Sequence, residues 1–420
     1  MHFPKNIAAL VLVISLMILP FLLGAASVIS GLVYTNIARI LLVIISWLLF
    51  ALLVLIIATA QNCSFVSRLK SLSIYDKLAL VVLLAVAVYT SQFVAISYKM
   101  AFYTTGISVA SVLIGFSFVQ LASRFGRIFV TAILYALFVG MLLHLTVMLS
   151  YVYLEAGNDA LDWAHAMPGY AAVRLYGYSV ELAIATGTGL FLLQPQKANA
   201  RSWLIFSGAA LLWGAIFWSG GRGAMASLIV SFILASIVLP HIILRLWGFV
   251  LATMSIGAAL SLLVWTPSSL SFGLINFFVR TTGGNATSSR LDMWKEAFTL
   301  FLDRPIFGHG ISQYHLYTQI ESFKTYPQVH NLILDALFSL GLIGGVCLLY
   351  LALKAWLKVV VRTKTAGISY TFPAFLGLNT LLAHSMLTGT YFYIHGQIYI
   401  AILFGLLFAT THKSDATVSS

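Results

Sequence analysis

Hydrophobic residues form long runs along this chain, and short polar connectors separate the runs. A helix needs about 20 apolar residues to cross roughly 30 Å of hydrocarbon. We predict twelve transmembrane helices, at residues 7–29, 38–60, 78–97, 107–122, 128–151, 175–194, 203–219, 224–243, 247–265, 331–353, 368–386 and 396–411. The short alternating segments of a membrane β-barrel do not appear, so the predicted fold class is an all-α polytopic membrane protein.

One long polar segment interrupts this pattern, and it predicts four regions along the chain. Residues 1–265 carry the first nine helices, 266–329 form a large loop, 330–411 carry the last three helices, and 412–420 are a polar tail. Within the loop, "SSRLDMWKEAFTLFLDRP" predicts an amphipathic helix on the membrane surface, capped by Ser288 or Ser289 and stopped by Pro305. "IFGHGISQYH" then reads as a glycine-rich turn, and a second short helix is expected over Tyr314–Phe323.

Composition excludes a soluble protein, because 61% of the residues are hydrophobic and only 8% are charged. The first apolar run has no clear small-residue cleavage site after it, so we expect it to be a span and not a signal peptide. Two cysteines are too few for a disulfide framework or a thiolate metal site. The formal charge of +12 does not indicate nucleic acid, because the basic residues are spread through short loops.

The basic residues alternate between the two sides of the predicted bundle. Fourteen of the 23 Lys and Arg fall in one set of connectors, which the positive-inside rule places in the cytoplasm together with both termini. The other nine lie outside, and five of them belong to the large loop: Arg280, Arg290, Lys295, Arg304 and Lys324. A solvated loop face would explain these five, and so would a binding site for an anion.

Three outer arginines stand at the ends of predicted helices. Arg222 lies in the small-residue turn "WSGGRGAMAS", Arg174 opens a span, and Arg290 begins the loop helix. A charge at membrane depth usually marks a functional site, although Arg222 and Arg174 would also serve as snorkelling interfacial anchors. Glu181, two turns beyond Arg174, is expected to be buried and paired.

His330 opens the tenth predicted span, three residues after Pro327. A lone histidine there would normally be a hydrogen-bonded interfacial residue or a polar helix cap. Nearby cations would keep its ring neutral, and a neutral imidazole is able to accept a proton from a hydroxyl. Gly341, Gly344 and Gly345 farther along would permit close helix packing.

Several catalytic motifs are absent from the sequence. It has no Asp-x-Asp pair, no His-x-x-Glu-His cluster, no phosphate-binding Gly-x-x-x-x-Gly-Lys loop and no Gly-x-Ser-x-Gly elbow. We therefore expect chemistry without a metal, a cofactor or ATP.

The motifs "SGGRGAM", "SSRLDMWKEAFTLFLDRPIFGHG" and "VHNLILDALFSLGLIGG", in this order, resemble the O-antigen ligase and polymerase superfamily. The detailed match covers about 215–345. The resemblance implies a membrane glycosyltransferase that takes a glycan from undecaprenyl pyrophosphate in the periplasm. It carries over to Arg222, Arg290 and His330 as catalytic residues, whereas the motif around Arg174 varies between branches. We expect Arg174, Arg304, Lys324 and Asn331 to bind substrate.

The resemblance leaves several activities open. We expect an inverting ligase of the bacterial inner membrane, with lipid A–core as the acceptor. The alternatives are a polysaccharide polymerase, a protein O-oligosaccharyltransferase and, from a different class, a flippase or transporter. The chain ends soon after its last predicted span, which disfavours the protein acceptor, and its halves show no repeat of broken helices, which disfavours a transporter.

Overall fold

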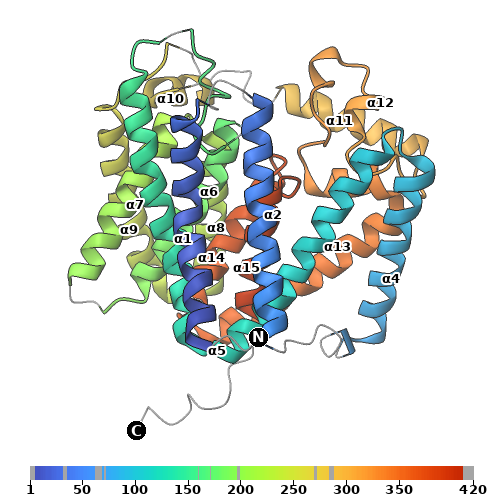
Figure 1. Ribbon diagram of the computed structural model, residues 1–420, viewed down its shortest axis with the longest axis horizontal. Helices are drawn as coiled ribbons and strands as arrows, with labels where there is room; N and C mark the ends of the chain where they lie inside the picture. Colours follow the sequence, from blue (N-terminus) through green and yellow to red (C-terminus); the bar gives the residue numbers. More distant parts are fainter. Residues whose placement is uncertain are drawn as a thin grey trace.

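The computed structural model describes residues 5–31, 36–61, 69–70, 72–158, 160–170, 172–195, 199–268, 272–282 and 288–409. Throughout these ranges the chain is helical, without a strand, which confirms the predicted all-α class. Figure 1 shows long helices running side by side, with a group of short helices at one end of the bundle. The predicted tail at 412–420 lies outside the described residues.

The first part of the bundle contains α1 (Lys5–Ile29), α2 (Asn36–Ala60), α4 (Ile74–Tyr89) and the 57-residue α5 (Tyr98–Leu154). A short π-helix, η2 (Thr90–Val94), extends α4. Gly126 has φ 74° and breaks α5 into two rods, because only glycine adopts this backbone conformation without strain. The two rods correspond to the predicted spans 107–122 and 128–151.

The remaining long helices are α6 (Val173–Leu192), α7 (Ala200–Trp218), α8 (Arg222–Val238), α9 (Ile243–Ser261), α13 (Leu332–Ala366), α14 (Phe372–Ser385) and α15 (Ile394–Phe408). A one-turn 3-10 helix, η3 (Pro240–Ile242), precedes α9. Nearly every residue of α6 and α14 is buried, so these two helices form the centre of the bundle. They pack against each other, and α8 packs on α14.

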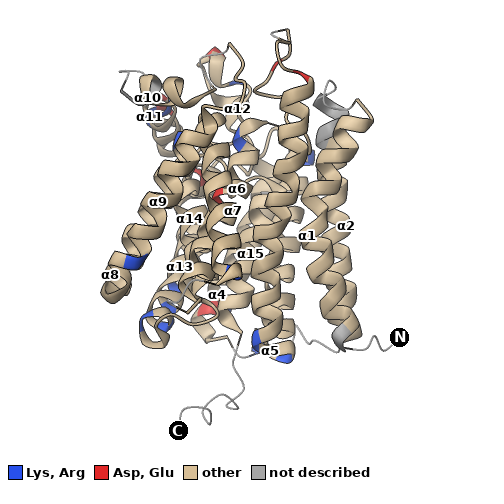
Figure 2. Cartoon of the chain, turned by 90° about the vertical axis from the view of Figure 1, so that its left-hand side faces the viewer, with Lys and Arg blue, Asp and Glu red and all other residues tan. Residues whose placement is uncertain are grey.

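Each of the twelve predicted spans overlaps a described helical segment. Seven helices in the described part are long and apolar enough to cross a membrane, and the protein is a polytopic membrane protein. The count of twelve stays a prediction. Figure 2 shows Lys and Arg at both ends of the bundle, with several at the end opposite α10–α12.

The large loop contains α10 (Leu274–Thr282), α11 (Ser288–Asp303), α12 (Tyr314–Tyr317) and the 3-10 turn η4 (Glu321–Phe323). The predicted helix at 288–303 is present. The helix expected over Tyr314–Phe323 is not continuous, because Thr318 has extended backbone and separates α12 from η4. We did not predict α10 from the sequence.

The helix α11 carries the apolar stripe Leu291, Trp294, Phe298 and Phe301 that its helical spacing predicts, and it also buries a second face. Met293 and Ala297 are buried, with exposures of 2% and 1%, whereas Leu291 and Phe298 are 45% and 48% exposed. The helix packs on α13 through its buried face. Its exposed apolar stripe is the part that remains for contact with a membrane surface.

Candidate active site

Four helices begin at the end of the bundle that carries the large loop, and each brings a candidate residue into its first turn or just before it. Arg174 is the second residue of α6, Arg222 is the first of α8, Arg290 is the third of α11, and His330 precedes α13 by two residues. Helix N-termini carry partial positive charge and present unpaired N–H groups, so they are natural sites for anions. The positive charge of an arginine at these positions opposes the helix dipole.

Electrostatic interactions show that the four residues lie near one another. Burial lowers the pKa of Arg290, and the positive charges of Arg174 and Arg222 lower it further. Burial also lowers the pKa of His330 to about 3, with additional contributions from Arg174 and Arg290. These interactions link the three arginines and the His330 ring in the structure.

The backbone of His330 is strained. Its φ is 57°, in the left-handed region that a residue with a side chain rarely adopts. The next residues compensate for this, because Asn331 Oδ1 accepts hydrogen bonds from the N–H groups of Ile333 and Leu334 and so caps α13. Strain of this kind persists where the surroundings fix the residue, and it is common at active sites.

Two further contacts fix the strained turn. The Val329 N–H donates to Asp335 Oδ1 at 3.1 Å, and the Val329 side chain is fully buried in the loop's small core. The His330 ring lies edge-on to Tyr326, with centroids 4.9 Å apart. Within the described part of the chain, Nε2 of His330 is buried without a hydrogen-bond partner. This nitrogen is available for chemistry.

The glycine-rich turn at Pro305–Gly310 docks into a break in α13. Gly341 has φ 63°, and a Cβ there would lie 2.3 Å from the carbonyl oxygen of Ile306. The His309 and Gly310 N–H groups donate to the carbonyls of Phe338 and Ser339 at 2.8 and 2.9 Å. The sequence indicated close helix packing at Gly341, but its main task is to admit the loop.

Glu296 fixes α11, and with it Arg290, to the rest of the loop. Its carboxylate accepts hydrogen bonds from the hydroxyls of Tyr314 and Thr318, both at 2.6 Å, and from the Gln319 N–H at 2.8 Å. A carboxylate with three donors is a strong anchor. The loop therefore holds Arg290 on a rigid element.

The remaining predicted binding residues have partners elsewhere. Arg304 is exposed and lies over the Tyr317 ring, 5.9 Å from its centroid. Lys324 pairs with Glu321 at 2.6 Å on the surface. The Asn331 amide caps α13 and also donates to the Met386 carbonyl at 3.1 Å. The contacts of Arg304 and Lys324 lie within the loop and do not join them to the arginine cluster, which consists of Arg174, Arg222 and Arg290. Asn331, by contrast, caps the helix that begins beside His330.

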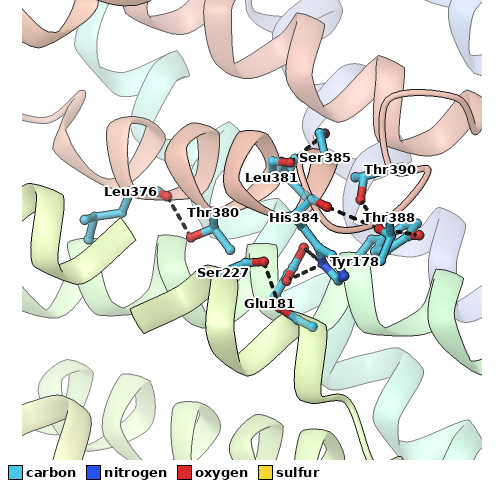
Figure 3. Close-up of polar contacts among 11 residues, drawn as sticks. Tyr178, Glu181, Ser227, Leu376, Thr380, Leu381, His384, Ser385, Thr388 and Thr390 are labelled. Carbon is cyan, nitrogen blue, oxygen red and sulfur yellow. Dashed lines mark hydrogen bonds and ion pairs between the residues drawn. The ribbon is translucent and has the colours of Figure 1, made fainter. Parts of the chain in front are cut away.

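Sequence reasoning missed a buried histidine beneath the cluster. His384 of α14 contacts the carboxylate of Glu181, with 2.7 Å between Nδ1 and Oε1 (Figure 3). The expectation that Glu181 is buried and paired is confirmed. An ionisable residue inside an apolar helix was the available signal for His384.

Comparisons with known proteins found one family and one relative that are similar to parts of this chain. Residues 207–349 match the model of a family described as O-antigen ligase. A protein of Haemophilus influenzae, named only "Uncharacterized protein", is 21% identical over 265 residues, which are 58% of this chain and 62% of that protein. The chain thus spans less than two thirds of this relative's length.

The matched stretch contains Arg222, Arg290 and His330, together with the loop that positions them, whereas Arg174 and His384 lie outside it. The motifs quoted from the sequence fall within the same limits. Over residues 207–349, this match supports the resemblance of the chain to the O-antigen ligase superfamily.

Proposed function

We propose that this protein is an O-antigen ligase, which transfers a glycan from undecaprenyl pyrophosphate to a sugar hydroxyl of lipid A–core. The observation that carries the proposal is the grouping of Arg174, Arg222 and Arg290 at helix N-termini around His330. A lipid-linked diphosphate carries the charge that such a cluster binds, and its tail remains in the bilayer. The site then lies on the periplasmic side of the inner membrane, with both termini in the cytoplasm.

In the proposed reaction, Nε2 of His330 takes the proton of the acceptor hydroxyl. The hydroxyl oxygen forms a bond to the anomeric carbon, and the bond from that carbon to the diphosphate oxygen breaks with inversion. The diphosphate leaves with the bonding electrons, and Arg222 and Arg290 stabilise its growing negative charge. The forked guanidinium suits this task, because it offers paired donors to phosphate oxygens. The reaction needs neither ATP nor a metal.

Donor binding would also prepare the base. In the free protein the pKa of His330 is about 3, which makes its ring a weak proton acceptor. The negative diphosphate would offset the positive charges of Arg174 and Arg290 and raise this pKa toward the range useful for catalysis. His330 would therefore become an effective base only after the donor is bound.

Gln328 is suited to set the tautomer of this base. The carboxamide nitrogen of Gln328 lies 3.5 Å from Nδ1 of His330, and the carboxamide oxygen is buried without a partner among the described residues. A half-turn of the carboxamide exchanges these two atoms. With that oxygen turned toward Nδ1, the ring keeps its proton on Nδ1. The lone pair on Nε2 then faces the acceptor.

A polymerase or a protein O-oligosaccharyltransferase would use the same donor and the same cluster, so the acceptor decides among them. The test is transfer by purified protein, without ATP or metal, to lipid A–core, a second lipid-linked unit and a serine-containing peptide offered together. A ligase glycosylates lipid A–core preferentially. Elongation of the second lipid-linked unit would identify a polymerase, and movement of an unchanged lipid across a vesicle membrane would identify a flippase.

A further inference from the structure

Glu181 and His384 form a polar pair in the centre of the bundle that the proposed reaction does not yet use. Nδ1 of His384 lies 2.7 and 2.8 Å from the two carboxylate oxygens of Glu181. The side chain of His384 is 5% exposed, and that of Glu181 is 0% exposed. A carboxylate accepts hydrogen bonds, so the shared proton lies between Nδ1 and the carboxylate and the ring's other nitrogen, Nε2, is directed elsewhere.

Nε2 of His384 points at the first turn of α8. A Cβ built on Gly223 would lie 2.7 Å from Nε2, so the ring lies directly against the backbone one residue after Arg222. No side-chain hydrogen bond caps α8 at Gly221. In the part of the chain that is described, Nε2 has no hydrogen-bond partner, although His384 is only 4% exposed.

The ring cannot easily turn away from this position. Tyr178 lies edge-on to it with centroids 4.7 Å apart, and the Tyr178 hydroxyl donates to Thr388 Oγ1 at 2.9 Å. Figure 3 shows the ring between Glu181 and Tyr178. Arg290 is close enough to act electrostatically on both Tyr178 and His384. The pair therefore belongs to the arginine cluster, although it lies deeper in the bundle.

We propose that His384, held by Glu181, is a further diphosphate-binding residue, whose Nε2–H donates to a phosphate oxygen at the first turn of α8 beside Arg222. This inference rests on the proposed function, since it assigns a second contact to the same donor. With one proton on Nε2 and a second shared between Nδ1 and the Glu181 carboxyl group, the pair carries no net charge, which makes its burial cheaper than that of a lone charge. The helix N-terminus, Arg222 and Nε2–H then converge on one anion.

The contact divides the diphosphate between two groups of residues. Arg174 and Arg290, beside His330, hold one phosphate, and Arg222 and His384 hold the other. A polyprenyl monophosphate has a single phosphate, which Arg174 and Arg290 hold, so it lacks the contact with His384. The protein therefore distinguishes diphosphate from monophosphate lipids through His384.

The sharpest test is His384→Asn. The asparagine Nδ2 takes the place of the histidine Nδ1, so the bond to Glu181 is retained while the group facing α8 is removed. Binding of undecaprenyl pyrophosphate and of undecaprenyl monophosphate to the purified protein is measured for each variant. The ratio of the two affinities should fall about 10-fold or more in His384→Asn, as expected for the loss of a hydrogen bond to a charged group.

The double variant E181Q/H384Q provides the rescue. It carries no buried charge, and the amide of the introduced glutamine on α14 would place an N–H donor where Nε2 stood, so the ratio should recover substantially. The matched control is Ser385→Ala. Ser385 is the buried neighbour of His384, and its hydroxyl bonds only to the Leu381 carbonyl among the described residues, so the ratio should stay at its wild-type value.

Three outcomes would overturn the assignment: an unchanged ratio in His384→Asn, an equal loss of both lipids in that variant, or no recovery in the double variant. An equal loss would mean that the pair only supports the fold around Arg222. If one of these three outcomes is found while the wild-type protein still binds the lipid diphosphate and requires His330 for transfer, the role of His384 is wrong and the proposed function stands. If the wild-type protein binds no lipid diphosphate, the proposed function fails as well.

Discussion

Arg290 stands at the third position of α11, where the helix dipole and two neighbouring arginines all oppose its positive charge. Replacing it with glutamine removes the charge and keeps a side chain of similar length. A cation in the first turn of a helix costs about 0.3–1 kcal/mol, and the repulsion from Arg174 and Arg222 adds to this cost. Arg290→Gln should therefore raise the free energy of unfolding by about 1 kcal/mol.

The same substitution should reduce glycan transfer by about 100-fold or more, because a preorganised cation on the leaving group is lost. Arg290→Lys should leave the stability unchanged and still impair transfer, because lysine keeps the charge without the fork. Stability is measured by thermal unfolding of the purified protein in detergent, where about 1 kcal/mol corresponds to a shift on the order of 1–2 °C in a chain of this size.

Arg304 offers a matched control for this measurement, because it follows the last residue of the same helix. The dipole favours a cation at a C-terminus, so Arg304→Gln should lower the stability by a similar amount. If Arg290→Gln is no more stable than the wild type, or if the two substitutions shift the unfolding temperature in the same direction, the cluster is not strained by its own charges. Repulsion among these arginines would then not indicate a site for an anion.

The turns around the site give three more predictions. Gly341 has φ 63°, and a Cβ there would collide with the Ile306 carbonyl oxygen, so Gly341→Ala should lower the free energy of unfolding by about 1–3 kcal/mol. Gly248→Ala is the control, because a Cβ at Gly248 meets open space and should cost little stability. Equal shifts of the two variants in thermal unfolding would contradict the docking of the loop. Asn331→Ala should lose about 1 kcal/mol of stability through the α13 cap, and Asn331→Asp should retain most of it, as thermal unfolding of both variants would report. The folded pKa of His330, about 3, lies below the ordinary 6.5, so its contribution to stability is present above pH 6.5 and is lost as the pH falls toward 3. Denaturant unfolding at several pH values should show a steeper acid loss, by about 1.4 kcal/mol per pH unit, in the wild type than in His330→Asn, and parallel curves would refute the assignment.

The sequence predicted the helical bundle because the length of an apolar run is a strong local signal. It did not predict the break in α5 at Gly126. Nothing in the spacing shows that 107–122 and 128–151 form one helix with a break. The buried face of α11 was not predicted, because Leu291 and Phe298 fit an apolar stripe as well as Met293 and Ala297 do. The choice between the two stripes depends on α13, a helix distant in sequence.

The candidate site shows the same division between local and long-range information. Arg222, Arg290 and His330 were found from motifs and from charge at helix ends, which are local features. The positive φ of His330 and the approach of His384 to Gly223 depend on several helices meeting at one place. Such contacts between distant segments cannot be derived from hydrophobic periodicity.

The most direct test of the central claim is glycan transfer by the purified protein, measured with His330 and Arg222 variants. With undecaprenyl-pyrophosphate-linked glycan and lipid A–core as substrates, His330→Ala should abolish product while the protein still inserts into the membrane and still binds the donor. Arg222→Ala and Arg222→Lys should both bind the donor weakly and form little product. Turnover by His330→Ala at the wild-type rate would contradict the account.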